Sequence, residues 1–308
     1  MKKDLLSLFD LETDDFDYLF NRAIELKKRH KQGIFDQSLA GKSVGMIFDK
    51  PSTRTRISFE AATIQLAGTP IFMNSGDTQI SRNEPVEDTA RVLSRYIDCL
   101  VVRTYSQKLI EDYAGQCTIP VINALSDQSH PCQILSDLMT VIEYKGGYQG
   151  LKIAWIGDGN NVAHSWINAA SVLGFELVLS CPEGYTPDTD ILDRAWARNT
   201  GIIRVTPDPV DAVADADVVY TDVWASMGQE DELEARMALF RPYQVNAKLL
   251  DAAKKDVCVM HCLPAHRDEE ITHDVIEGRH SIVWDQAENK LHMHKAILET
   301  LILKHKNH

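Results

Sequence analysis

The sequence predicts an α/β protein with two domains that each contain a parallel sheet, and three observations lead to this prediction. Short apolar runs typical of buried strands alternate with helical patterns along the chain, which indicates βαβ units. At 308 residues the chain is long for a single core, so two domains of roughly 150 residues are expected. A polar, glycine-rich turn at Lys145–Gly150 divides the alternating pattern into two sets and is the predicted domain boundary.

The first set begins with a helix predicted from Thr13 to about His30, because Asp14 and Asp15 in the first turn favour a helix N-terminus. The apolar runs that follow predict four strands, and the stretches between them predict helices. The predicted strands are Ser43–Phe48, Thr69–Met73, Asp98–Val102 and Pro120–Asn123, and the predicted helices are Arg56–Leu66, Val86–Tyr96, Gln107–Ala114 and Pro131–Tyr144.

The second set predicts six further strands in the same alternation. They are Lys152–Ile156, Glu176–Ser180, Ile202–Val205, Asp217–Tyr220, Val257–Met260 and Ser281–Trp284. One more helical stretch, Ala287–Lys304, follows the last of them.

The composition excludes two classes of partner. Asp and Glu total 45 and Lys and Arg total 32, which leaves a formal net charge of −13. Nucleic acids and anionic membranes require a basic face, so neither is an expected partner. The segment Met1–Leu11 mixes charges with short apolar stretches, unlike a signal peptide. The six cysteines form no CxxC pair and are typical of thiols in a reducing compartment, so we expect a cytoplasmic protein without disulfides.

A segment rich in hydroxyls and arginines, Ser52–Arg56, follows the first predicted strand and opens a helix. Ser and Thr at such a junction can simply cap the helix. The same position attracts phosphate, because backbone N–H groups and the helix dipole point outward there. Arg54 and Arg56 add planar charged donors. Arg103, directly after another predicted strand, either adds charge at this sheet edge or forms a surface salt bridge.

His130 precedes Pro131, the first position of a predicted helix. The helix dipole lowers the pKa of an imidazole at this position, and a neutral imidazole can donate one hydrogen bond to a carbonyl oxygen. Gln133, one turn further on, offers an amide to the other end of a carbamoyl group. The alternative is a histidine that caps the helix.

Two loops after predicted strands of the second set carry polar groups. Gly157–Asn161 resembles a dinucleotide fingerprint, but position 162 is Val where the third glycine belongs, so a nucleotide site is not expected. Asn161 then remains as a polar group at a helix N-terminus. In the other loop, Asp222 and Ser226 suit an ammonium group, and the alternative is that Asp222 caps a helix.

The segment His261–Arg267 is the most informative in the chain, because Cys262 stands between imidazoles directly after an apolar strand-like run. Three interpretations remain open. One is a zinc site formed by His261, Cys262 and His266, although adjacent ligands argue against it. Another is a nucleophilic thiol paired with histidine. The third is a thiol and a loop backbone that align an acyl acceptor.

These motifs, in this order and spacing, resemble the ornithine carbamoyltransferase family from end to end. Ser52–Arg56, Arg103 and His130–Gln133 belong to the pattern shared with the aspartate carbamoyltransferases. Asp222–Gly228 and His261–Pro264 are typical of the ornithine branch.

The resemblance implies transfer of a carbamoyl group from carbamoyl phosphate to the δ-amine of L-ornithine, a reaction of arginine biosynthesis that yields citrulline and phosphate. It implies two doubly wound parallel-sheet domains. Residues 1–145 would bind carbamoyl phosphate and residues 151–286 ornithine, and a C-terminal helix within 287–308 would cross back to the first domain. It further implies a homotrimer or an assembly of trimers, and neither a metal nor an organic cofactor.

The resemblance also assigns roles, with Cys262, Arg103 and His130 as the catalytic residues. By this resemblance, the phosphate would be surrounded by Ser52, Thr53, Arg54, Thr55, Arg103 and Gln79, the last from its own or a neighbouring subunit. The carbamoyl group would be surrounded by Arg103, Thr55, His130 and Gln133. The amino-acid end of ornithine would be bound by Asn161, Asp222, Ser226 and Met227, and the δ-amine would be oriented by Cys262 and the Leu263 carbonyl.

One position departs from the family, which has Arg where this chain has Lys290. A lysine retains the positive charge but lacks the planar fork, so we expect Lys290 to contact the carbamoyl group more loosely. Three rival functions remain. An aspartate carbamoyltransferase would need basic residues for two carboxylates, which Asp222 would repel. A nicotinamide-dependent dehydrogenase would use the Gly157 loop, and a non-catalytic sensor would retain only the phosphate pocket.

Overall fold

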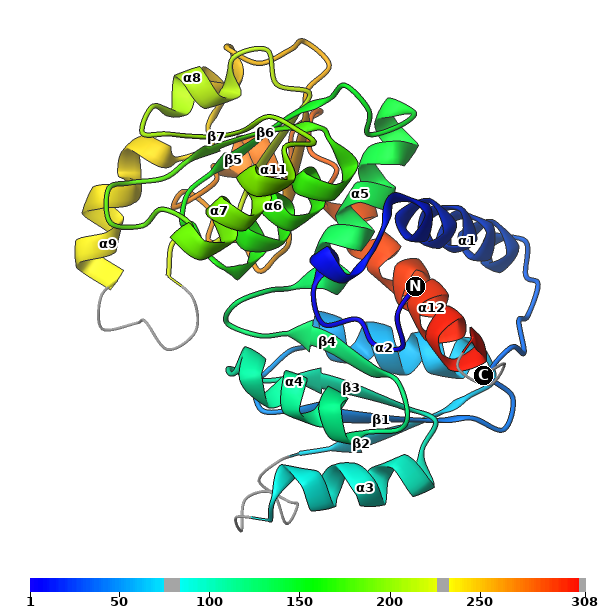
Figure 1. The fold of residues 1–308 in the computed structure, drawn as a ribbon. Coiled ribbons are helices and arrows are strands. Elements are labelled where there is room, and N and C mark those ends of the chain that lie inside the picture. Colours follow the sequence, from blue (N-terminus) through cyan, green and yellow to red (C-terminus); the bar gives the residue numbers. More distant parts are fainter. Residues whose placement is uncertain (75–83, 226–232, 305–308) are drawn as a thin grey trace. The chain divides into compact units, whose positions relative to one another are not determined.

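The computed structural model describes residues 1–74, 84–225 and 233–304, with the backbone alone for 233–235 (Figure 1). It divides into two compact units, which we call unit 1 (Met1–Met139 with Glu288–His308) and unit 2 (Thr140–Ala287). Helices α5 (Pro131–Lys145) and α12 (Val283–Lys304) each continue from one unit into the other. The assignment of one substrate to each predicted domain remains a prediction.

Unit 1 contains a sheet of parallel strands in the order β2-β1-β3-β4. The chain runs from β1 to β2 on one side and then crosses back to β3 on the other side of β1. Such a reversal creates a crevice at the carboxyl ends of the strands, where open α/β sheets bind ligands. The strands are β1 (Ser43–Phe48), β2 (Thr69–Met73), β3 (Cys99–Arg103) and β4 (Val121–Leu125).

Helices cover both faces of this sheet, as the predicted doubly wound fold requires (Figure 1). On one face, α3 (Val86–Tyr96) and α4 (Gln107–Gln116) contribute Ala90 and Ile110 to a buried cluster with Leu100 of β3. Figure 1 shows α2 (Arg54–Gln65) on the opposite face.

The C-terminal part of α12 is an integral element of unit 1. It packs against α1 (Thr13–Lys31), where Arg22 forms a two-pronged ion pair with Glu299 at 2.6 and 3.0 Å. It also packs against α2, where the His294 ring stacks on Phe59 with 3.6 Å between ring centres. The sequence-based expectation that the terminal helix joins the first domain is confirmed within unit 1.

The contact between α1 and α12 contains a buried histidine that should make unit 1 sensitive to acid. Burial, followed by the nearby Lys295 ammonium, lowers the pKa of His292 to about 4. An unfolded histidine titrates near pH 6.5, so between these values the folded protein binds fewer protons than the unfolded chain. The free energy of unfolding should therefore fall as the pH drops through this range, by about 3 kcal/mol in total.

Urea unfolding of wild type and His292→Gln between pH 7.5 and 4.5 measures this contribution. The glutamine variant cannot titrate at this position, so its stability should fall less steeply with decreasing pH. Identical pH dependence of the two proteins would show that His292 does not carry the effect.

Unit 2 contains a second parallel sheet, in the order β7-β6-β5-β8-β9. Here the chain runs from β5 to β6 and β7 and then crosses back to β8 and β9 on the other side of β5. The crevice therefore lies at the carboxyl ends of β5 and β8. The strands are β5 (Lys152–Ile156), β6 (Glu176–Ser180), β7 (Ile203–Thr206), β8 (Val218–Thr221) and β9 (Cys258–His261).

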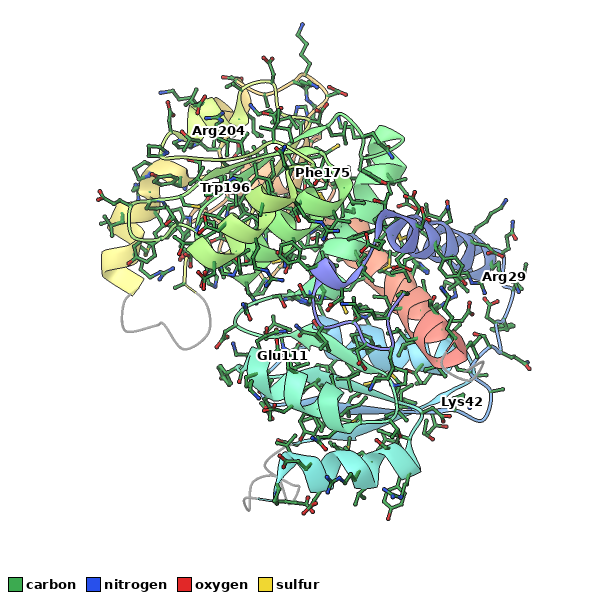
Figure 2. All side chains as sticks on the ribbon, viewed as in Figure 1. Arg29, Lys42, Glu111, Phe175, Trp196 and Arg204 are labelled. Carbon is green, nitrogen blue, oxygen red and sulfur yellow. The ribbon has the colours of Figure 1, made fainter. Side chains whose placement is uncertain are left out.

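Alternate residues of these strands pack on opposite faces of the sheet. On one face, the Trp155 ring stacks on Tyr220 at 5.3 Å, and Trp166 of α6 (Asn161–Leu173) meets Tyr220 edge-on. Phe175, labelled in Figure 2, packs edge-on against the same Trp166. On the other face, apolar residues of α8 (Pro209–Val213), α10 (Ala247–Leu250) and α11 (His273–Ile276) form a separate core with Ala154 and its neighbours. The remaining helices of unit 2 are α7 (Thr189–Arg198) and α9 (Leu233–Phe240).

One predicted strand is wrong. Ser281 forms only an isolated parallel bridge with Val259, and α12 begins at Val283, inside the predicted strand Ser281–Trp284. The helix therefore starts four residues before the predicted Ala287. Across the described ranges, no helix is long and apolar enough to cross a membrane.

Candidate functional site

In unit 1, the first group of predicted site residues lies at the reversal point of the sheet. Phe48 at the end of β1 is the register partner of Arg103 at the end of β3. The backbone N–H of Asp49 donates to the Arg103 carbonyl oxygen at 2.9 Å, which extends the pairing beyond the strand. The segment after β1 and the buried Arg103 side chain therefore start from adjacent positions on the ligand-binding edge of the sheet.

The segment Ser52–Arg56 forms the N-terminus of α2. The Ser52 hydroxyl accepts a hydrogen bond from the Thr55 backbone N–H at 3.2 Å, so capping by Ser52 is real. The first turn contains no acidic residue, which leaves the positive end of the helix dipole available to an anion. Arg54 is half-buried and Thr53 is exposed. Arg56 is directed elsewhere, since it pairs with Glu60 at 2.9 Å.

Lys290 brings a positive charge from α12 into this region. Its side chain is only 4% exposed, and its ammonium group donates to the Thr55 hydroxyl at 3.0 Å and to the Gln133 amide oxygen at 2.7 Å. The predicted position at the start of the terminal helix is wrong, because α12 starts at Val283 and Lys290 lies well inside it. Because the side chain is buried and hydrogen-bonded, Lys290 is not a solvated surface lysine.

His130 is buried next to the same cations. Burial, then the positive charges of Lys290 and Arg103, lower the pKa of His130 well below its ordinary value. The imidazole is therefore neutral at physiological pH, as the sequence predicted, but the main cause is burial rather than a helix dipole. Gln133, also buried, donates from its amide nitrogen to Asp137 at 2.8 Å, which orients the amide oxygen toward Lys290.

Sequence reasoning missed His294 as a neighbour of this cluster. Its Nδ1 lies 3.0 Å from the Ser58 hydroxyl, and burial followed by the Lys290 charge lowers its pKa well below the ordinary value. The available signal was its spacing from Lys290, because residues four apart share one face of a helix. Gln79, which was also predicted for this site, lies outside the described residues.

In unit 2, a second cluster forms at the ends of β8 and β9. Thr221 is the register partner of His261, so Asp222 and Cys262 follow adjacent strand ends. The Cys262 thiol donates to one carboxylate oxygen of Asp222 at 3.1 Å. The Asn160 amide donates to the other oxygen at 2.9 Å. The first oxygen also accepts from the Val223 N–H at 2.9 Å. Residues 222–225 are not helical, so within the described residues no helix starts directly after Asp222.

Asn160 is the second residue that sequence reasoning missed. It caps α6 by accepting from the N–H groups of Val162 and Ala163, and its amide nitrogen reaches Asp222. The predicted Asn161 is the first residue of α6 and sits beside it. Of two adjacent asparagines, the sequence offers no signal for which one reaches the acid. Ser226 and Met227 lie outside the described residues.

The loop after Cys262 is held by the buried His261 ring. Its Nδ1 accepts from the Leu263 N–H at 2.9 Å, so Nε2 carries the proton and faces Glu270 at 3.0 Å. Glu270 in turn accepts from the His266 N–H at 2.7 Å. Leu263 has a φ of 58°, a conformation that these hydrogen bonds support. Because both ring nitrogens are engaged, the arrangement disfavours the zinc interpretation.

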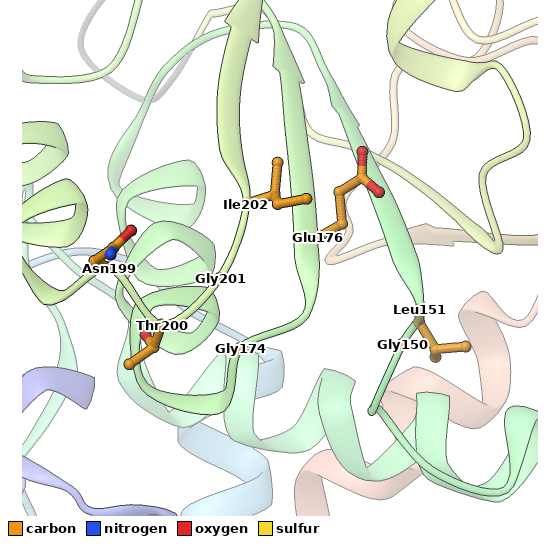
Figure 3. A pocket seen from close by; sticks show the side chains of 8 residues that line it. All are labelled: Gly150, Leu151, Gly174, Glu176, Asn199, Thr200, Gly201 and Ile202. Atoms are coloured by element: carbon orange, nitrogen blue, oxygen red, sulfur yellow. The ribbon is translucent and has the colours of Figure 1, made fainter.

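A cavity of about 420 Å³ lies at the amino ends of the strands in the unit 2 sheet (Figure 3). Leu151, Glu176 and Ile202 line it, next to the amino ends of β5, β6 and β7. The Asp222 and Cys262 cluster is at the carboxyl ends of strands in the same sheet. The cavity is therefore separate from the cluster of unit 2 and offers a single ionisable side chain, Glu176.

Fold and clusters together define a two-domain α/β protein that presents buried positive charge in unit 1 and a buried acid beside a thiol in unit 2. Two family descriptions match the chain. Residues 3–143 match the carbamoyl-P binding domain of aspartate/ornithine carbamoyltransferase, and residues 149–301 match the Asp/Orn binding domain.

The named relatives show whether the chain resembles the aspartate or the ornithine carbamoyltransferases. The chain is 59% identical over 302 residues to the ornithine carbamoyltransferase of Syntrophus aciditrophicus. The matched region covers 98% of this chain and 100% of that protein. The solved structure of the Pyrococcus furiosus ornithine carbamoyltransferase is 51% identical, with a TM-score of 0.92 over 96% of this chain and 95% of that one. The anabolic enzyme from Campylobacter jejuni is 37% identical, with a TM-score of 0.92 over 98% and 100%. The chain therefore belongs to the ornithine carbamoyltransferase family.

Proposed function

We propose that unit 1 binds carbamoyl phosphate, that unit 2 binds L-ornithine, and that the residues of the two clusters carry out the transfer between them. The reaction moves the carbamoyl group from carbamoyl phosphate to the δ-amine of L-ornithine and yields citrulline and phosphate. The observation that carries the site assignment is the buried Lys290 ammonium, held by Thr55 and Gln133 beside a neutral His130.

The phosphate end of the substrate is assigned to the N-terminus of α2. Backbone N–H groups and the helix dipole at this point suit a phosphate. Arg54 adds a half-buried guanidinium, and the buried Arg103 adds a second one from the end of β3. The same assignment extends to Ser52, Thr53, Thr55 and, outside the described residues, Gln79.

The carbamoyl group is assigned to Lys290, Arg103, Thr55, His130 and Gln133. Negative charge develops on the carbamoyl oxygen as the amine attacks, and donors already in position stabilise it without reorganisation. Arg103 and Lys290 supply full positive charge, and a neutral His130 still supplies one N–H. Phosphate then leaves toward the N-terminus of α2, where its growing charge is stabilised.

The amine acceptor is assigned to unit 2. The Asp222 carboxylate suits the α-ammonium group of ornithine, with Asn161, Ser226 and Met227 as further contacts. A free δ-ammonium has a pKa of about 10.4, so a pocket must favour its neutral form. The Cys262 thiol and the Leu263 carbonyl are hydrogen-bonding partners that suit a neutral amine. Most of the catalysis is then alignment and electrostatics.

A citrulline assay tests the function directly. Purified protein is incubated with carbamoyl phosphate and either L-ornithine or L-aspartate, and each carbamoylated product is quantified. We expect citrulline from ornithine and no comparable product from aspartate, because Asp222 would repel the additional carboxylate. Faster turnover of aspartate would contradict the substrate assignment.

Arg54→Ala tests the phosphate end. Loss of a charged hydrogen-bonding partner should cost about 1.5–3 kcal/mol, or roughly 10- to 150-fold in affinity for carbamoyl phosphate. Isothermal titration calorimetry without ornithine measures this affinity. Arg56→Ala is the matched control, since Arg56 pairs with Glu60 and should leave the affinity unchanged. Equal affinity of Arg54→Ala and wild type would remove Arg54 from the site.

Cys262 is proposed to align the amine without forming a carbamoyl-enzyme intermediate. Its thiol donates a hydrogen bond to Asp222, which holds it as a thiol rather than as the nucleophilic thiolate. Cys262→Ser should therefore retain measurable turnover with a weakened apparent ornithine constant, and Cys258→Ser in β9 serves as the control. Intact mass after incubation with carbamoyl phosphate alone should show no adduct. A stoichiometric carbamoyl adduct on Cys262 would establish double displacement instead.

The same family resemblance supports a homotrimer, or an assembly of trimers, with a role in arginine biosynthesis. Unit 1 exposes apolar side chains suited to a subunit contact, namely Ile57 and Ile64 on α2 and Ile71 on the edge strand β2. Light scattering on the purified protein would give the mass of the assembly.

None of the six cysteines, which all lie in the described ranges, forms a disulfide. This supports the proposal of a cytoplasmic location.

A further inference from the structure

Arg236 of α9 is a buried arginine in unit 2 for which the reaction has no role so far. Its side chain is 3% exposed, and its Nε donates to the Trp224 carbonyl oxygen at 2.6 Å. Its terminal Nη2 forms a short ion pair with Asp158. The guanidinium lies over the rings of Tyr185, at 4.4 Å, and Phe240, at 5.2 Å. Nε, Nη2 and the flat face are thus engaged, which explains why such a group is retained in a buried position.

Two polar partners of Arg236, Asp158 and Trp224, belong to the two loops that form the Asp222 cluster. Asp158 follows β5 and stands two residues before Asn160, whose amide donates to Asp222 at 2.9 Å. Trp224 follows β8 and stands two residues after Asp222. One guanidinium therefore joins the loop that carries Asn160 to the loop that carries Asp222, in addition to the hydrogen bond between these two residues.

We propose that Arg236 is a positioning residue for ornithine, which sets the Asp222 carboxylate by tying the loop after β5 to the loop after β8. This inference rests on the assignment of Asp222 to ornithine. Only arginine suits the task, because Nε and Nη2 point to different partners from one rigid plane. A lysine offers a single charged centre, so it would reach Asp158 or the Trp224 carbonyl but not hold both.

The alternative is that Arg236 only stabilises the fold, and a double substitution separates the two roles. Removing one member of a buried ion pair leaves the other charge uncompensated and destabilises the protein, whereas removing both relieves that penalty. The double variant Arg236→Met with Asp158→Asn should therefore unfold close to the wild-type temperature, although each single variant unfolds earlier. The tie between the loops is nevertheless lost in the double variant.

Ornithine affinity is then the deciding measurement. In the double variant we expect the ornithine dissociation constant and the apparent ornithine constant to rise about 10- to 100-fold, the effect of misplacing a binding group by about an ångström. The carbamoyl phosphate constant should stay within about twofold, since that substrate is assigned to unit 1. Arg236→Lys should give an intermediate ornithine constant.

The matched control is Arg204→Met. Arg204, labelled in Figure 2, forms an exposed ion pair with Asp211 in the same unit, and both substrate constants should be unchanged. Wild-type ornithine affinity in a folded double variant would overturn the proposal and reduce Arg236 to a stabilising residue. If the wild type binds ornithine in calorimetry but forms no citrulline, the proposed function fails, and the binding constants still decide the role of Arg236. If the wild type does not bind ornithine, both proposals are wrong.

Discussion

Lys290→Met should lower the turnover number about 100- to 1,000-fold, the usual effect of removing one preorganised donor that faces developing negative charge. The ammonium group is buried and fixed by hydrogen bonds to Thr55 and Gln133, so its charge is already in position before the reaction. Lys290→Arg should retain activity, because the positive charge is preserved. Steady-state citrulline formation at saturating ornithine measures the effect, and the carbamoyl phosphate constant should change less than turnover does.

Lys295→Met is the matched control for this prediction. Lys295 is also buried and also on α12, but it lies near His292 and not in the Thr55 cluster, and burial lowers its pKa. Its loss should leave turnover close to that of the wild type. Comparable turnover of Lys290→Met and Lys295→Met would show that the Lys290 charge has only a structural role.

Asp222→Asn should raise the apparent ornithine constant far more than the carbamoyl phosphate constant. Removing the charge from one side of a buried ion pair costs about 2–5 kcal/mol, or roughly 30- to 4,000-fold in affinity. The substitution preserves the shape of the side chain and retains an acceptor oxygen for Asn160 or Cys262, so a large effect would report charge rather than packing. Steady-state kinetics with each substrate varied in turn provide both constants.

Asp217→Asn is the control at the other end of the same strand. Asp217 precedes β8 and pairs with Lys254 at 2.7 Å, away from the carboxyl edge that carries Asp222. It should alter stability without a selective change in the ornithine constant. Equal changes of both substrate constants in Asp222→Asn would mean that this acid organises the loop and does not meet the ammonium group.

The regular elements could be predicted because each is dictated locally. The runs Ser43–Phe48 and Lys152–Ile156 are apolar on both faces, as strands inside a parallel sheet must be. The failure at Ser281–Trp284 has a physical cause. Ile282 does donate its N–H to the Val259 carbonyl oxygen at 3.0 Å, as a strand residue would, but the helix begins at the next residue. Periodicity cannot separate so short an apolar run from the first turn of a buried helix.

The site was predictable where a motif is continuous and not where tertiary structure assembles it. Thr55 and Gln133 were identified within their own segments. Lys290, which joins them from 235 residues beyond Thr55, was identified only because it departs from the family pattern. Arg236 has no local signal, because a single arginine in a short helix is more typical of a solvated surface. Its burial depends on Phe240 of the same helix and on Asp158 and Tyr185, which come from other parts of unit 2.

The contribution of α12 to unit 1 has a consequence for the order of events during synthesis. Unit 2 is one continuous stretch, Thr140–Ala287, whereas unit 1 is completed by a helix that leaves the ribosome after all of unit 2. Until then Phe59 lacks the ring that stacks on it, and Arg22 lacks its partner Glu299. A nascent chain therefore exposes an unfinished first unit for most of its translation. Premature termination anywhere before α12 would yield a product without Lys290. The apolar surface that α12 normally covers would then be exposed to chaperones and proteases.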